Sequence, residues 1–356
     1  MPNPVLTRAI DEVASGRDLS SEEAAEVLAE IMHGEVSETQ IAGFLIALRT
    51  KGETVDELTG LASTMRSLAA HVPTEREDLL DTAGTGGGRS TFNVSTTAAL
   101  IAAGAGCAVA KHGNRSATSR SGSADLLEAL GARIDLPAAA VARCIDEAGF
   151  GFMFAPAHHQ ATRFVVPVRR ELSVRTIFNL IGPLTNPAGA RRQLIGVSDR
   201  QFLETIAGAL AKLGVDRALV VAGEDGMDEI SVAAATTVVE VNGEEISRYT
   251  LTPGEIGIEL SERAAGERDY AGGTPLQNAA LTRAILDSAR PGAQHRASVD
   301  LATINAGAAI YVAGRADTIA DGVEAARTAL EEGSAAEALE RYLLASRAHA
   351  PAKGAS

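Results

Sequence analysis

The chain has 356 residues and a formal net charge of −14; 46% of its residues are hydrophobic but only 3% are aromatic. This acidic balance argues against a nucleic-acid partner, because such binding needs clustered lysine and arginine side chains. The length suits one large domain with a smaller companion, and the composition predicts an aliphatic core of the α/β kind.

The sequence also lacks the signals of a secreted or membrane protein. Its two cysteines, Cys107 and Cys144, show no CxxC spacing, so neither a disulfide framework nor a zinc site is predicted. No stretch reaches the ~20 apolar residues of a membrane span, and no signal sequence is recognisable at the N-terminus. We therefore expect a cytoplasmic protein with no membrane partner.

Residues 1–72 predict a small helical domain of four helices. Asn3 is the first capping residue, and capping boxes begin at Ser20, Ser37 and Thr54. Apolar stripes at helical spacing follow each cap. Because so small a unit cannot bury every stripe, we expect a homodimer formed through residues 41–48 and 58–65. The stripes comprise Leu6, Ile10, Val13, Val27, Leu28, Ile31, Ile41, Phe44, Leu45, Leu48, Leu58, Leu61 and Met65.

Residues 73–347 predict an α/β domain, because short apolar runs alternate there with helical patterns. We expect a central, mostly parallel sheet flanked by helices, a hairpin turning at Asn242-Gly243, and a flexible tail over residues 348–356. The predicted strands are 79–83, 107–110, 150–154, 193–197, 218–222, 237–241 and 245–249. The predicted helices lie near 96–105, 123–130, 138–148, 199–213, 278–289, 299–313 and 317–332.

A glycine-dense loop follows the first predicted strand, within the run DTAGTGGGRSTFNVST (81–96). Its glycines, at 84, 86, 87 and 88, can take positive φ and let backbone N–H groups approach an anion. The next helix begins near Ser95 and Thr96 and adds partial positive charge. The run is neither a P-loop nor a GxGxxG fingerprint. It predicts a phosphate cradle, with a simple tight turn as the alternative.

A second polar loop, KHGNRSATSRSGS (111–123), follows the second strand and holds three cationic side chains and five hydroxyl groups. A loop of this length in a compact domain is more often functional than a mere solvated connection. Ligands of open α/β sheets gather at the carboxyl ends of strands, so we expect both loops to face one crevice.

Two further pairs of residues are candidate ligands. Asp228 and Glu229 follow a strand, and beside phosphate-binding loops such carboxylates suit Mg²⁺; alone, they would indicate an ordinary acidic turn. His158 and His159 lack a third metal ligand nearby, which favours a loop contact or a channel lining.

The segments GTGG…TFNVST, KHGNRSATSRSGSAD and DEIS resemble the anthranilate phosphoribosyltransferases, as do VRRELSVRTIFNLIGPLTNP (168–187) and NAGAAIYVAG (305–314). The similarity runs from about Leu6 to the last helix. It implies a homodimer whose subunits have a small helical and a large α/β domain. Phosphoribosyl pyrophosphate (PRPP) and two Mg²⁺ ions per monomer would lie in the cleft between the domains. About 168–185 would pack on the helical domain.

The resemblance also implies an activity and a set of site residues. The phosphoribosyl group would pass from PRPP to anthranilate in tryptophan biosynthesis. Anthranilate would contact Gly84, Asn114 and Arg169, with His112 and Pro156 lining its path, and Ser95, Asp228 and Glu229 would hold the metal ions. The PRPP set would be Gly84, Gly87, Gly88, Thr91, Asn93, Val94, Ser95, Thr96, Lys111, His112, Gly113, Asn114, Arg115, Ser116, Ala117, Thr118, Ser119 and Ser123.

One departure from the family pattern falls in the glycine loop. The family commonly has an acidic residue after GTGG and one more residue before TFN, where this chain has Gly88 and a shorter loop.

Two other functions are compatible with parts of the sequence. A pyrimidine nucleoside phosphorylase would share the glycine loop and a lysine-containing loop, but the full KHGNR run and the Asp228-Glu229 pair argue against it. A non-catalytic nucleic-acid-binding relative is disfavoured by the acidic charge. No Ser-His-Asp or Cys-His arrangement is recognisable, so we expect no covalent nucleophile.

Overall fold

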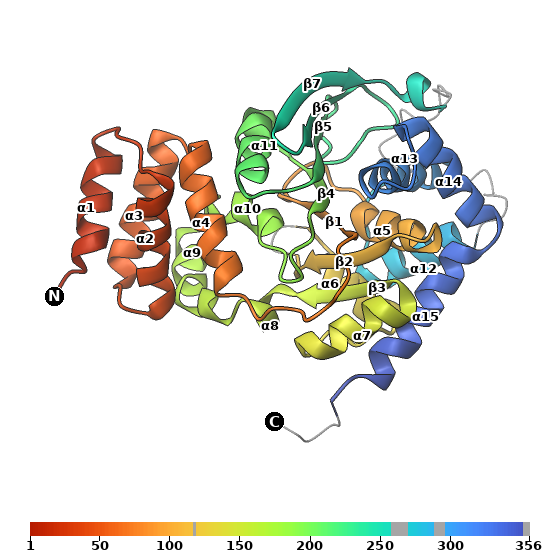
Figure 1. The fold of residues 1–356 in the computed structure, drawn as a ribbon, viewed down its shortest axis with the longest axis horizontal. Coiled ribbons are helices and arrows are strands. Elements are labelled where there is room, and N and C mark those ends of the chain that lie inside the picture. The colour runs from red at the N-terminus through yellow and green to blue at the C-terminus, as the bar shows by residue number, and fades with distance from the viewer. Residues whose placement is uncertain (117–118, 258–269, 288–295, 352–356) are drawn as a thin grey trace.

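The computed structural model describes residues 1–116, 119–257, 270–287 and 296–351. Its N-terminal region contains the four predicted helices, shown in red and orange in Figure 1. Asn3 caps the first helix, and Ser20 and Thr54 form complete capping boxes. Ser37 caps the third helix, but its predicted box is incomplete, because Gln40 Oε1 accepts instead from the Asn3 N–H at 2.9 Å. The helices are α1 (Pro4–Ala14), α2 (Ser21–His33), α3 (Glu38–Lys51) and α4 (Val55–Ser67).

Seven strands of the described residues form one sheet, in the order β3-β2-β1-β4-β5-β6-β7. The first five in this order are parallel, and β6 and β7 form the predicted antiparallel hairpin. The second strand extends further than predicted, because Lys111 and His112 pair with Phe152 and Met153 of the neighbouring strand. The strands are β1 (Leu79–Gly84), β2 (Ala108–Gly113), β3 (Phe150–Phe154), β4 (Arg192–Gly196), β5 (Arg217–Gly223), β6 (Thr236–Asn242) and β7 (Glu245–Leu251).

Helices flank this sheet as predicted. One of them was not predicted from the periodicity of the sequence. That helix is α15, which packs on α5 and α7. The two helices α15 and α5 approach closely, since a Cβ atom at Gly104 would lie 2.5 Å from the Ala335 Cα atom. Of the predicted tail, residue 348 ends this helix and residues 352–356 lie outside the described part. The helices are α5 (Val94–Gly104), α6 (Ser123–Leu130), α7 (Ala138–Ala148), α11 (Leu203–Lys212), α12 (Pro275–Leu286), α13 (Arg296–Val312), α14 (Ile319–Glu331) and α15 (Ser334–Ala348).

The chain between β3 and β4 forms short helical turns beside the N-terminal helices (Figure 1). Val168, Phe178 and Leu184 from this stretch share a hydrophobic cluster with the helices α1 to α4. Among the described residues, no helix is long and apolar enough to span a membrane. The turns are α8 (Ala155–His158), η1 (Gln160–Phe164), α9 (Val166–Leu172), α10 (Phe178–Ile181) and η2 (Gly182–Leu184).

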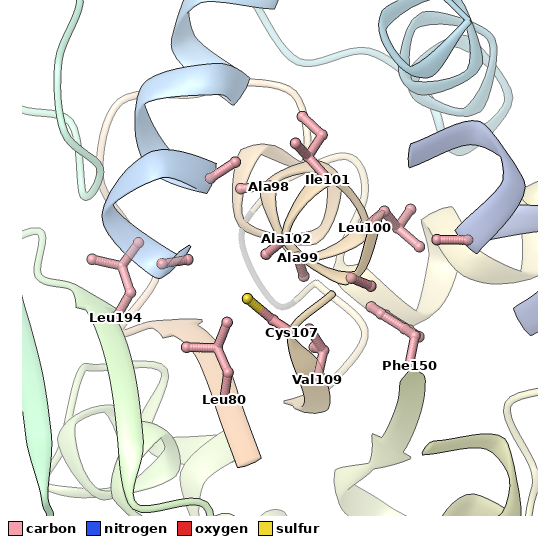
Figure 2. Close-up of a cluster of buried hydrophobic side chains, with 14 of the residues drawn as sticks. Leu80, Ala98, Ala99, Leu100, Ile101, Ala102, Cys107, Val109, Phe150 and Leu194 are labelled. Atoms are coloured by element: carbon pink, nitrogen blue, oxygen red, sulfur yellow. The ribbon is translucent and has the colours of Figure 1, made fainter. Parts of the chain in front are cut away.

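Two hydrophobic clusters cover the two faces of the sheet, and alternate strand residues point into each. Leu194 of β4 belongs to the cluster that contains α5, which Figure 2 shows above Leu80, Val109 and Phe150. The next residue, Ile195, belongs to the cluster that contains α1 to α4 and α11. The core of the helical region is therefore continuous with one face of the sheet.

This continuity overturns the reason for which we expected a dimer. Ile41, Leu48, Leu58 and Met65 are at most 6% exposed, because α3 and α4 pack on α1 and α2 and also on α9, α10 and α11 within one chain. The stripes at 41–48 and 58–65 are therefore core residues of the single chain.

Candidate active site

The glycine loop lies where the strand order reverses. The chain passes from β1 outward to β2 and β3, and then returns to place β4 on the other side of β1. The carboxyl ends of β1 and β4 are paired at Gly84 and Gly196, and the Thr85 N–H donates to the Gly196 carbonyl at 2.9 Å. Such a reversal point is the usual ligand crevice of an open α/β sheet.

The glycines of this loop are needed for two different reasons. Gly86 and Gly87 have φ of 64° and 84°, as the phosphate-cradle prediction requires. Gly84 and Gly88 do not have positive φ, so the prediction was wrong for them. Their lack of a side chain makes room for Asp228, because a Cβ atom at Gly88 would lie 2.4 Å from the Asp228 Oδ1 atom and one at Gly84 3.4 Å from Oδ2.

The structure brings the three predicted metal-binding residues together. The backbone N–H of Ser95 stabilises the Glu229 carboxylate and that of Gly86 stabilises the Asp228 carboxylate, and each opposes the rise in pKa that burial causes. The side chain of Asn305, on α13, bonds both the N–H and the carbonyl of Ile230 at 3.0 Å and so fixes this segment.

Both carboxylates are partly buried, and their electrostatics suit a divalent cation. Loss of water raises the pKa of Glu229 well above its ordinary value, and the neighbouring Asp228 charge raises it further. Loss of water also raises the pKa of Asp228. No group of three or more histidine, cysteine or acidic side chains that could hold a metal is found in the described residues. Two carboxylates and a serine hydroxyl instead fit Mg²⁺, which retains several waters.

Lys111 lies behind this site and is 1% exposed. Its Nζ atom donates to the Thr82 carbonyl, lies 3.2 Å from the Thr82 Oγ1 atom and lies 3.4 Å from the Ser95 Oγ atom. Burial lowers the pKa of Lys111 to about 8, whereas the nearby Asp81 charge opposes this shift. The ammonium group therefore lies between Thr82 and Ser95, and the predicted Lys111 contact with PRPP remains a prediction.

The second polar loop meets the glycine loop through Asn93. Asn93 Nδ2 donates to the Ser121 carbonyl at 3.0 Å, and the Ser121 hydroxyl donates back to Asn93 Oδ1 at 3.1 Å. This contact confirms that the two loops lie side by side. Asn114 is exposed, and its side chain accepts from the Arg115 N–H at 2.7 Å.

Other predicted PRPP residues of this second loop are held by contacts within it. Arg115 pairs with Asp125 and Glu128 of α6, and Ser116 Oγ lies 2.7 Å from Ser119 Oγ. Ala117 and Thr118 lie outside the described residues. Gly113 ends β2 close to Ser123, where α6 begins.

In the first turn of α5, the side chains of two predicted PRPP contacts point into the protein interior. Val94 and Thr96 are at most 1% exposed, so their side chains belong to the interior and only their backbones could reach a ligand. The Thr96 hydroxyl has no hydrogen-bond partner among the described residues. Thr91 pairs with Ala271 in an isolated antiparallel bridge, which anchors the end of the glycine loop.

Arg169 has the environment expected of a carboxylate-binding residue. It lies on α9 with its guanidinium carbon 5.4 Å from the centre of the Phe178 ring, and partial burial lowers its pKa. Among the described residues it forms no ion pair. A partly desolvated guanidinium without a counter-ion is suited to pair both oxygens of a ligand carboxylate.

The three neighbouring histidines are buried and neutral. His158 Nδ1 lies 3.1 Å from the Ala70 carbonyl and His159 Nε2 lies 3.1 Å from the Thr185 carbonyl, so both are loop contacts. The rings of His112 and His159 are 5.1 Å apart, and burial lowers the pKa of each.

Sequence reasoning missed two residues that shape the site. Asp81 is fully buried in β1; its Oδ1 accepts from the His112 N–H at 3.1 Å and its Oδ2 from Asn186 at 2.8 Å. Burial raises the pKa of Asp81 to about 6. A charged residue inside a predicted strand was the available signal. Arg175 contacts the Gly86 carbonyl of the glycine loop from far along the chain, and no local pattern indicates this contact.

A separate depression of about 340 Å³ lies between β6, β7 and α14 and contains no predicted site residue. Its inner wall is Glu240, whose carboxylate accepts from Arg217, Tyr249 and Tyr311. These polar groups satisfy one another, so the depression does not compete with the crevice as the active site.

Comparisons with known proteins agree with this geometry. Residues 7–69 match the helical bundle domain and residues 76–336 the α/β domain of a glycosyl transferase family. Anthranilate phosphoribosyltransferase of Rubrobacter xylanophilus is 51% identical over 344 residues, which cover 96% of this chain and 98% of the relative. That of Moorella thermoacetica is 49% identical over 337 residues, which cover 94% of this chain and 97% of the relative.

Solved structures show the same likeness. The anthranilate phosphoribosyltransferase of Thermus thermophilus is 45% identical, with a TM-score of 0.88 over 95% of this chain and 99% of that one. The Saccharomyces cerevisiae enzyme in complex with PRPP and Mg is 25% identical, with a TM-score of 0.86 over 96% of this chain and 98% of that one. By sequence, by fold and by the residues gathered in its crevice, the chain belongs to the anthranilate phosphoribosyltransferases.

Proposed function

We propose that this chain transfers the phosphoribosyl group of PRPP to the amine of anthranilate, as in tryptophan biosynthesis, giving N-(5-phosphoribosyl)anthranilate and pyrophosphate. The observation that carries the proposal is the meeting of the glycine loop, Ser95 and the Asp228-Glu229 pair at the reversal point of the sheet. The names of the relatives and the PRPP and Mg complex of the yeast enzyme support it.

In this proposal the glycine loop and the first turn of α5 bind the pyrophosphate through backbone N–H groups. Ser95, Asp228 and Glu229 hold two Mg²⁺ ions. When bound, the ions neutralise the charge that develops on the departing pyrophosphate. Lys111 adds a fixed positive charge behind Ser95, since its buried ammonium lies 3.4 Å from that hydroxyl. The second polar loop, including the predicted residues 113–119 and Ser123, binds the remainder of PRPP.

The acceptor site places the anthranilate carboxylate on Arg169 and the ring near Gly84 and Asn114. The reaction breaks the C1–O bond of PRPP and forms a C1–N bond, and the amine loses a proton. The residues align the amine with C1 and stabilise the leaving charge, so a covalent nucleophile is not required. Burial raises the pKa of Cys107 to about 12 and of Cys144 to about 11, which leaves both thiols unreactive.

We also propose a cytoplasmic homodimer. Since the stripes at 41–48 and 58–65 are buried within one chain, the support comes from the family resemblance and from apolar side chains that remain exposed. Ile46 on α3 is 38% exposed and Val166 on the adjoining α9 is 42% exposed.

An enzyme assay tests the proposed activity. Protein is mixed with PRPP, Mg²⁺ and anthranilate, and the loss of anthranilate fluorescence is followed together with pyrophosphate release. Equimolar loss and release are expected, and neither should occur without Mg²⁺. A chain that ignores anthranilate but releases base from pyrimidine nucleosides in the presence of phosphate would instead be a nucleoside phosphorylase.

A further inference from the structure

Arg175 lies against the glycine loop, although about ninety residues separate them. Its Nη2 atom donates to the Gly86 carbonyl at 2.8 Å and lies 3.5 Å from the Thr85 carbonyl. Its Nη1 atom donates to the Ser198 hydroxyl at 2.8 Å, and that hydroxyl donates in turn to the same Gly86 carbonyl at 2.9 Å. The Arg175 side chain is exposed and forms no ion pair with the carboxylates of the described residues.

These contacts determine where the N–H groups of the loop point. In a trans peptide unit the carbonyl and the following N–H point in opposite directions. The Thr85 and Gly86 carbonyls face Arg175, so the N–H groups of Gly86 and Gly87 face the other side of the loop. Asp228 lies on that side, because a Cβ atom at Gly84 would lie 3.4 Å from its Oδ2 atom and the Gly86 N–H stabilises its carboxylate. The candidate metal site and the Gly87 N–H therefore share one side.

The loop lies close to Arg175 on one side and to Asp228 on the other. A Cβ atom at Gly87 would lie 2.8 Å from the Arg175 Nη1 atom, and one at Gly88 would lie 2.4 Å from Asp228. The loop is thus enclosed by a guanidinium on one side and a carboxylate on the other.

A strained turn brings Arg175 to this position. Ser173, which ends α9, has φ of 52° and is the sole residue other than glycine with positive φ in the described part of the chain. Arg49 of α3 fixes the turn by donating to the Arg175 carbonyl at 2.9 Å. Backbone strain of this kind persists where surrounding contacts determine it and clusters at functional sites.

We propose that Arg175 is a positioning residue for PRPP: by binding the Thr85 and Gly86 carbonyls, it directs the N–H groups of the glycine loop at the pyrophosphate. It also ties the loop to the segment that follows α9, the helix that carries Arg169. The inference rests on the proposed function, because it requires that the glycine loop bind PRPP.

Three variants test it by steady-state kinetics. Arg175→Met removes the guanidinium, Arg175→Lys keeps the charge without the planar fork, and Arg170→Met removes an exposed charge of the nearby helix α9 as a control. We expect Arg175→Met to raise the KM for PRPP about tenfold and to leave that for anthranilate within about twofold. Arg175→Lys should fall between it and the parent, and Arg170→Met should match the parent. The proposal would be overturned if Arg175→Met raised the KM values for PRPP and anthranilate equally. It would also be overturned if Arg170→Met raised the KM for PRPP as much as Arg175→Met does.

Hydrogen exchange gives a readout that needs no turnover. In the absence of PRPP, the amides of the peptide spanning 84–93 should exchange about tenfold faster in Arg175→Met than in the parent, and peptides of α1 to α4 should be unchanged. Unchanged exchange in the loop would refute the positioning role. If the parent does not turn over PRPP and anthranilate, the proposed function fails. If the parent is active and the Arg175 variants have the same kinetics and exchange as the parent, only the role of Arg175 fails.

Discussion

Arg169 shows how one side chain can determine the acceptor. It is partly buried and stacked near Phe178, and within the described residues it has no carboxylate partner. PRPP offers phosphates to many groups of the crevice, whereas anthranilate offers one carboxylate. Arg169 should therefore act on one substrate and not on the other.

We expect Arg169→Met to raise the KM for anthranilate far more than that for PRPP. Losing a charge-assisted bidentate contact costs about 1.5–3 kcal/mol, which corresponds to roughly a tenfold to hundredfold increase. Steady-state kinetics with each substrate varied in turn measures the difference, and Arg170→Met controls for the loss of charge. Equal increases for both substrates would remove Arg169 from the acceptor site.

The buried histidines predict how stability depends on pH. An unfolded imidazole protonates near 6.5, whereas burial lowers the pKa of His159 to about 4 and also lowers those of His112 and His158. Between these values the unfolded chain binds more protons, so stability that is present above pH 6.5 is lost as the pH falls toward 4.

Urea unfolding at several pH values checks this expectation. The free energy of unfolding of the parent minus that of His159→Gln should decrease between pH 6.5 and about 4, because only the parent carries this imidazole. The glutamine amide can still donate to the Thr185 carbonyl. His33→Gln, at an exposed position, is the matched control. A slope identical in the parent and in His159→Gln would contradict the assignment of a buried neutral imidazole.

At the scale of single residues, the sequence predicted which residues would meet better than it predicted the direction of their side chains. Gly86, Gly87, Asp228 and Glu229 were expected in one phosphate and metal site because they follow predicted strands, and the structure places Asp228 beside the glycine loop. Lys111 was placed in a loop, although it is a strand residue whose ammonium is buried behind Ser95. Orientation depends on the register of neighbouring strands, which a single sequence does not contain.

At the scale of elements, local signals succeeded where the structure depends on neighbours in the chain. The capping residues before α1 to α4 and the Asn242-Gly243 hairpin are of this kind. The helix α15 was missed, because three of its seven buried positions are alanine and one is serine, which gives a weak apolar stripe. Leu339, Tyr342 and Leu343 are nevertheless buried, and packing on α5 and α7 holds the helix in place.

Gly88 of the glycine loop is predicted to be needed because a side chain there would collide with Asp228, and not because of its φ angle. Gly88→Ala would place a Cβ atom 2.4 Å from Asp228 Oδ1 and 2.9 Å from the Asp228 N atom, so Asp228 must shift. We expect turnover to fall at least about tenfold and the Mg²⁺ concentration for half-maximal rate to rise. Gly254→Ala, where nothing lies within 4 Å, is the control. Parental Mg²⁺ dependence in Gly88→Ala would show that Asp228 does not position a metal.

At the scale of the whole molecule, the helical region and the sheet share a core. The apolar stripes of α3 and α4 are buried against α1 and α2 and also against α9, α10 and α11, which return from later in the chain. Sequence order separates these elements by roughly one hundred residues or more, so periodicity alone could not show what the stripes pack against. The family resemblance did imply that 168–185 packs there.

We still predict a dimer, now through the exposed residues of α3 and α9. Sedimentation equilibrium at micromolar concentration should give about twice the chain mass of 36.7 kDa. A charge at the exposed Ile46, as in Ile46→Glu, should shift the population toward monomer without lowering the melting temperature, whereas Ile246→Glu, exposed on β7, should not. A monomer in the parent protein would refute the dimer.

The central claim is that Ser95, Asp228 and Glu229 bind metal ions that hold the pyrophosphate of PRPP against the glycine loop. Calorimetric titration of PRPP into the protein, with and without Mg²⁺, tests it most directly when the parent is compared with the double variant Asp228→Asn, Glu229→Gln. We expect Mg²⁺ to tighten PRPP binding to the parent by at least about tenfold and to have little effect on the variant. Equal Mg²⁺ dependence in both proteins would contradict the claim, and the two carboxylates would then be an acidic turn beside the loop.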